Sequence, residues 1–167
     1  MILGMNTSTF TLIHVVLSLA GIGSGFVVLL GLLNRKRLDG WTTIFLTTSI
    51  LTSVSGFLFP FERLLFSHVL GLLSLAVLTI AIFARHVFGC AGSGRWIYVV
   101  AASLALYFNC VAAVVQLFAK VSALKAIAPT QTEPVFVAAQ LVMLAIFVVL
   151  TILAVKRFAG VLVYPRL

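Results

Sequence analysis

Acidic side chains are almost absent from this chain. Asp39, Glu62 and Glu133 are the three acidic residues among 167, and none of them lies inside a long apolar run. A proton-coupled pump normally keeps a buried carboxylate in the membrane, and an ion channel normally has a filter of charged groups or carbonyls. The sequence shows neither feature, so it argues against both classes of protein.

Cysteine is equally scarce, and catalytic motifs are missing. Cys90 lies in a connection and Cys110 lies near the middle of an apolar run, so their separation predicts no disulfide. The sequence contains no CxxC pair, HExxH, P-loop or GxSxG. We therefore expect no catalytic residues, no metal site and no enzymatic activity by this chain alone.

Five long apolar runs occupy most of the sequence. They comprise 21 to 24 residues each and cover residues 10–33, 41–61, 64–84, 96–119 and 134–155. A hydrocarbon core of ~30 Å needs about 20 helical residues. Hydrophobic residues make up 63% of the chain and charged residues 8%, a balance that soluble domains do not have. The sequence predicts an all-α integral membrane bundle of five transmembrane helices, forming a single domain over residues 1–167.

The basic residues predict the orientation of this bundle. One side of a five-span arrangement receives eight of them, Arg35, Lys36, Arg37, Arg85, Arg95, Lys156, Arg157 and Arg166, and the other side receives Arg63, Lys120 and Lys125. Lys and Arg accumulate in cytoplasmic connections. We expect the N-terminus outside and the C-terminus in the cytoplasm. The first run is too long for a signal-peptide core and is interpreted as a retained span.

The net charge of +8 does not indicate nucleic-acid binding. The basic residues stand at the ends of the spans and do not gather on a soluble face. At these positions they meet anionic lipid headgroups, so the expected surroundings are the bilayer and other membrane subunits, or further copies of the chain itself.

Four segments carry a resemblance that covers most of the chain. Residues 34–41 (NRKRLDGW), 57–61 (FLFPF), 95–100 (RWIYVV) and 125–134 (KAIAPTQTEP) resemble segments of small multi-pass inner-membrane proteins of proteobacteria. The resemblance implies a bacterial inner membrane. It implies no reaction, ligand or site residue.

Polar side chains inside the runs provide the candidate binding residues. His14 and His68 are predicted near the outer ends of the first and third spans, at similar depth. Two imidazoles from different helices at one level are the minimum for bis-histidine haem b, and they are also able to hydrogen-bond a quinone head. Gln116 and Gln140 fall at comparable outer depth, so convergence of the four faces would make one polar pocket. The alternative is that all four side chains make interhelical hydrogen bonds.

The first span also contains a small-residue pair, Gly21 and Gly25. Such a GxxxG pair favours close contact between helices, and it also leaves room for a flat cofactor beside His14. We expect bulky side chains at these two positions to disturb the bundle more than at Gly31.

Two functions remain open at this point. The first is a non-catalytic accessory or assembly subunit of a membrane complex. The second is a small redox or ligand-binding membrane protein that holds haem b or quinone near the outer leaflet through His14 and His68.

Overall fold

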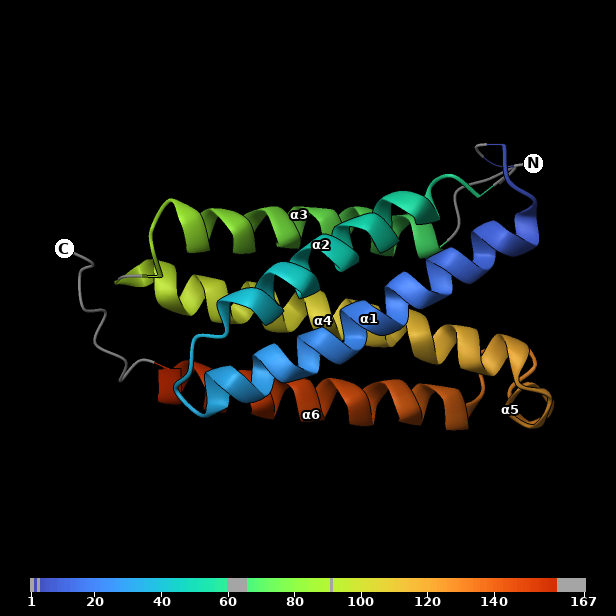
Figure 1. Cartoon of the computed structure of the whole chain (residues 1–167). Helices are drawn as coiled ribbons and strands as arrows, with labels where there is room; N and C mark the ends of the chain where they lie inside the picture. The colour runs from blue at the N-terminus through green and yellow to red at the C-terminus, as the bar shows by residue number, and fades with distance from the viewer. Residues whose placement is uncertain (1, 3, 60–65, 91, 159–167) are drawn as a thin grey trace.

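The computed structural model describes residues 2, 4–59, 66–90 and 92–158 of the chain, with Phe66 described in its backbone alone. Within them the protein is an all-α bundle (Figure 1). The helices are α1 (Thr7–Leu33), α2 (Asp39–Gly56), α3 (Phe66–His86), α4 (Ser93–Lys120), α5 (Ser122–Ile127) and α6 (Pro134–Phe158). Glu62, Arg63 and Arg166 lie outside the described residues.

Four of the described helices are long and apolar enough to cross a membrane. They are α1, α3 (from Ser67), α4 and α6. Helix α2 does not join them, because its many threonines and serines lower its hydropathy over its 18 residues. Each of the five apolar runs therefore contains a helix, as predicted, and four of these helices are candidate membrane spans by length and composition.

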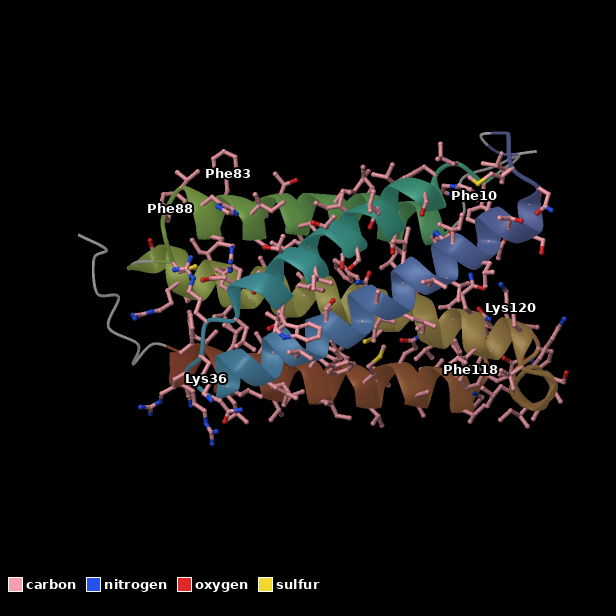
Figure 2. All side chains as sticks on the ribbon, viewed as in Figure 1. Phe10, Lys36, Phe83, Phe88, Phe118 and Lys120 are labelled. Atoms are coloured by element: carbon pink, nitrogen blue, oxygen red, sulfur yellow. The ribbon has the colours of Figure 1, made fainter. Side chains whose placement is uncertain are left out.

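The two ends of the bundle are distinct. Figure 2 places Lys36, Phe83 and Phe88 at one end, called here the Lys36 end, and Phe10, Phe118 and Lys120 at the other, the Phe10 end. Figure 1 shows α1, α2, α3, α4 and α6 each running from one end to the other, in alternating directions. Helix α2 thus covers the same two ends as its neighbours.

Helix α4 forms the middle of the bundle. It packs against α1, α3 and α6, while α2 packs between α1 and α3. Figure 1 shows α3 and α6 at opposite edges with the other long helices between them. Over half of the best apolar window of α4 is buried, compared with 6% for that of α6. Helix α6 is therefore the most peripheral long helix, and its buried residues are Phe147, Ala154 and Phe158.

Local hydrogen bonds define both ends of α1. Asn6 caps its start, because the Asn6 side-chain oxygen accepts a bond of 2.7 Å from the Thr9 amide. At its other end the Lys36 amide donates to the Gly31 carbonyl and the Arg35 amide to the Leu32 carbonyl. This pair of bonds is the Schellman arrangement, and Arg35 occupies its left-handed position with φ 58°. The chain therefore turns sharply before α2.

The glycines of α1 let its backbone approach α2 and α4. A Cβ atom at Gly25 would lie 2.6 Å from Leu106 Cδ1 and 2.9 Å from the Phe45 ring. A Cβ at Gly21 would lie 3.3 Å from the Ser49 hydroxyl oxygen. Close packing occupies this face, so the space for a flat cofactor beside these glycines, considered from the sequence, is filled by side chains.

The expected contrast with Gly31 is wrong. Gly31 is buried, and a Cβ there would lie 2.8 Å from Leu38 Cδ1 and 3.3 Å from the Lys36 carbonyl oxygen. The sharp turn after α1 folds Leu38 back over this glycine, which the spacing of residues within the run does not reveal. Gly23 is the open position in α1, with nothing within 4 Å.

Candidate functional site

The polar groups inside the bundle are arranged along α2, and His14 meets this helix near the Phe10 end. The His14 Nδ1 atom lies 2.8 Å from the Ser55 hydroxyl oxygen. The His14 ring also contacts the Phe59 ring edge-on, with centroids 5.3 Å apart. The Ser55 hydroxyl in addition bonds to the Thr52 carbonyl, which fixes its position. His14 is thus held against the C-terminal end of α2.

His68 reaches the same stretch of chain from α3. Its side chain is buried, and its ring lies 5.7 Å from the ring of Phe57. Residues 55–59 therefore contact both imidazoles, which places the two histidines at the same end of the bundle. This agrees with the shared depth expected from the sequence.

The two glutamines come from two other helices, α4 and α6. Gln116 is exposed on α4. Gln140 is half-buried on α6, with its Oε1 atom buried and without a hydrogen-bond partner. Gln140 lies on α6 and His68 on α3, and Figure 1 shows these two helices at opposite edges of the bundle. The structure thus brings His14 and His68 to a common segment, while Gln116 and Gln140 lie on α4 and α6.

A second polar contact lies in the middle of the bundle. The Asn109 amide nitrogen of α4 donates to the Ser49 hydroxyl of α2 at 2.8 Å, and both side chains are buried. The amide also lies beside Gly21, 3.5 Å from where a Cβ would be. The small glycine therefore allows α1, α2 and α4 to meet around one hydrogen bond.

A third polar group joins the helices at the Lys36 end. The Thr42 and Tyr98 hydroxyl oxygens, both buried, lie 3.3 Å apart. The Arg85 guanidinium lies over the Tyr98 ring, 5.9 Å from its centre. Arg85 Nη2 donates to Asp39 Oδ1 at 2.5 Å, and Arg37 Nε donates to the same oxygen at 3.1 Å. One carboxylate therefore holds two arginines and links α2 to α3.

The sequence did not reveal this ion pair. Arg85 is 6% exposed, although its place at the end of an apolar run predicted a charge facing lipid headgroups. The available signal was that Asp39 is the one acidic residue on the strongly basic side of the chain. Several basic residues are available to pair with such a carboxylate, and pairing stabilises a buried cation more than an exposed one.

Charge and burial at this end shift the pKa values of two side chains, Asp39 and Cys90. Burial raises the pKa of the Asp39 carboxyl, but the charges and hydrogen bonds of Arg85 and Arg37 outweigh burial and hold that pKa below its usual value. Burial raises the pKa of the nearby Cys90 thiol. Asp39 is therefore ionised, and Cys90 is a neutral thiol at neutral pH.

These contacts are of a structural kind. His14 with Ser55, Ser49 with Asn109, and Thr42 with Tyr98 each join two helices by side-chain hydrogen bonds. Among the described residues, no three His, Cys, Asp or Glu side chains gather as metal ligands. What the arrangement does chemically is satisfy polar groups across helix interfaces.

Comparison with protein-family models, curated proteins and solved structures gives no match for this chain. The function is therefore argued from the geometry described above.

Proposed function

We propose that this chain is a five-pass protein of a bacterial inner membrane, with its N-terminus outside and its C-terminus in the cytoplasm. In this proposal it acts without catalysis, as an accessory or assembly subunit of a membrane complex. The observation that carries the proposal is the pairing of polar side chains between helices, around glycines that bring the backbones together. Polar groups used in this way hold a bundle in one arrangement.

The proposal takes α2 as the fifth span. The packing of α2 between α1 and α3 supports this, as does its course from the Lys36 end to the Phe10 end (Figure 1). Three of its hydroxyls also need no water, since Thr42, Thr43 and Thr48 donate to carbonyls one turn earlier. Its 18 residues correspond to about 27 Å of helix, close to the thickness of the hydrocarbon core.

The charges at the two ends support the orientation. Among the described residues, the Lys36 end has Arg35, Lys36, Arg37, Arg85, Arg95, Lys156 and Arg157, and the Phe10 end has Lys120 and Lys125. The excess of positive charge favours the cytoplasm for the Lys36 end.

The test is purification from membranes in a mild detergent, followed by native electrophoresis and an absorption spectrum. The proposal predicts a colourless protein that migrates in an assembly larger than its own monomer. A monomer with a Soret band that sharpens on reduction would overturn it. Loss of that band in His14→Ala or His68→Ala would then establish the haem b alternative, with each histidine as an axial ligand.

A colourless monomer that retains stoichiometric quinone after purification would also contradict the proposal. In that case, loss of the quinone in His14→Ala, but not in the exposed-position control Gln116→Ala, would identify the quinone alternative.

A further inference from the structure

The surface of the bundle has a hollow at the Lys36 end whose lining changes from apolar to polar along its length. It has a volume of about 450 Å³ and is open to the outside. Its lining residues are Val27, Leu30, Gly31, Asn34, Lys36 and Leu38. The walls are apolar along α1, and the polar side chains occur where α1 ends.

The Schellman turn fixes the polar rim of this hollow. Because the Lys36 amide is bonded to the Gly31 carbonyl at 2.8 Å, the backbone of Lys36 is held over the end of α1. The Asn34 side-chain nitrogen is held in the same way, by a bond of 2.8 Å to the Leu30 carbonyl. The rim is thus built from groups whose positions are set by the helix end.

The positive charge of the rim is not paired with a carboxylate among the described residues. In the described part of the chain, Asp39 pairs with Arg37 and Arg85, and neither Lys36 nor the adjacent Arg35 has a carboxylate partner. The last turn of α6 adds Lys156 and Arg157, and Figure 1 shows that this turn lies beside the end of α1. Figure 2 shows blue side-chain nitrogens gathered around Lys36. An anion at this rim would meet several cations, and the one described carboxylate nearby, that of Asp39, is paired with Arg37 and Arg85.

The depth profile matches one kind of molecule. From Asn34 to Val27 is seven residues, so the apolar wall extends about 10 Å along α1 from the rim toward the middle of the bundle. If α1 spans a membrane, its end lies among the headgroups and its wall among the acyl chains. The hollow is therefore polar and positively charged at the headgroup level and apolar toward the middle of the bilayer. A phospholipid with its phosphate at Lys36 and an acyl chain along Leu30 and Val27 has the same order of polar and apolar parts.

We propose that this hollow is a binding site for one anionic phospholipid, with its phosphate at Lys36 and Asn34 and one acyl chain against Val27, Leu30 and Leu38. The site goes beyond the proposed accessory function and requires only that α1 crosses the bilayer. It holds whichever side of the membrane the Lys36 end faces, so a wrong orientation would leave it intact.

The test is native mass spectrometry of the intact protein, released from detergent micelles that contain phosphatidylglycerol and phosphatidylcholine in equal amounts. The proposal predicts one retained phosphatidylglycerol in preference to phosphatidylcholine. A cation at the membrane surface contributes about 1 kcal/mol to anion binding, which corresponds to about a fivefold change. Lys36→Gln is therefore expected to lower phosphatidylglycerol retention about fivefold, while Lys125→Gln at the Phe10 end leaves it unchanged.

A second pair of variants tests the apolar wall separately. Val27→Trp fills the hollow with an indole ring and leaves every charge in place, so retention of the lipid should be lost. Leu12→Trp, at a position 63% exposed on the same helix, is the matched control and should retain the lipid. Equal retention of the two lipids by the unmodified protein, or unchanged retention in Lys36→Gln or Val27→Trp, would overturn the proposal.

Discussion

Asp39 and Arg85 form an ion pair in which the two partners have very different surroundings. The Arg85 side chain is 6% exposed, whereas that of Asp39 is 52% exposed. Among the described residues Arg85 Nη1 is buried without a hydrogen-bond partner, so the Asp39 carboxylate is the main compensation for a buried cation. The two residues therefore have unequal roles in stability, although they share one bond.

Removing Asp39 should destabilise the protein more than removing Arg85. Asp39→Ala leaves a buried guanidinium unpaired and should lower the free energy of unfolding by about 2 kcal/mol. Arg85→Met removes the buried charge, and Asp39 keeps Arg37, so its cost should stay below about 1 kcal/mol. Thermal melts in detergent measure both, and the double variant should resemble Arg85→Met. A greater loss in Arg85→Met than in Asp39→Ala would show that the guanidinium is not compensated by this carboxylate.

The same ion pair predicts an acid-sensitive part of the stability. The pKa of Asp39 is lower in the folded protein than its ordinary value of 3.8. Its contribution is therefore fully present above that ordinary value and is lost as the pH falls from there through the lower pKa of the folded state. The pKa of Glu133 is also lowered, first by its bond from the Thr130 amide, so the comparison is between the unmodified protein and Asp39→Ala. The difference between their melting temperatures should shrink on acidification below pH 4, and a constant difference would contradict this assignment.

The glycines of α1 should differ sharply in their tolerance of a methyl group. Gly25→Ala places a Cβ 2.6 Å from Leu106 Cδ1, and the resulting overpacking should cost about 1–3 kcal/mol. Gly23→Ala meets nothing within 4 Å and should stabilise the helix by about 0.5–1 kcal/mol. Detergent melts of the two variants provide the measurement, with Gly23→Ala as the matched control. Equal effects would mean that α1 does not pack on α2 and α4 through Gly25.

The bond between Ser49 and Asn109 should contribute modestly, as bonds between membrane helices do. A double-variant cycle with Ser49→Ala and Asn109→Ala should give a coupling energy of about 0.6 kcal/mol. The two residues should also be thermodynamically independent of Thr42→Val at the Lys36 end. A coupling near zero between Ser49 and Asn109 would remove the interhelical role assigned to this pair.

The sequence predicted the helices of this protein better than their contacts. Uninterrupted apolar runs identify helices because a membrane span needs length and hydrophobicity and little else. Serines and threonines in α2 obscure that signal, since they lower its hydropathy even where their hydroxyls, as in Thr42, Thr43 and Thr48, are bonded inside the helix. The shared level of His14 and His68 was predictable from span lengths, because depth depends only on position along a helix.

The directions of the side chains were not predictable in the same way. Gln116 and Gln140 were grouped with the histidines by depth alone, and depth does not specify the rotation of α4 and α6 that sets where their side chains point. Similarly, Asp39 reaches Arg85 because the first connection folds toward α3, a relationship between residues 46 positions apart. Such contacts depend on which helices are neighbours, which one sequence of apolar runs does not specify.

The central claim is that α2 crosses the membrane, and labelling of single cysteines in intact cells tests it most directly. In a chain with Cys90→Ser and Cys110→Ala, the exposed positions Ser8, Ser93 and Ser122 are replaced one at a time by cysteine. Five spans place α1, α2 and α3 between Ser8 and Ser93, so a membrane-impermeant maleimide should label Ser8→Cys and Ser122→Cys from outside and should label Ser93→Cys after permeabilisation alone. If α2 did not cross, Ser8 and Ser93 would lie on the same side, and identical labelling of Ser8→Cys and Ser93→Cys would contradict the account.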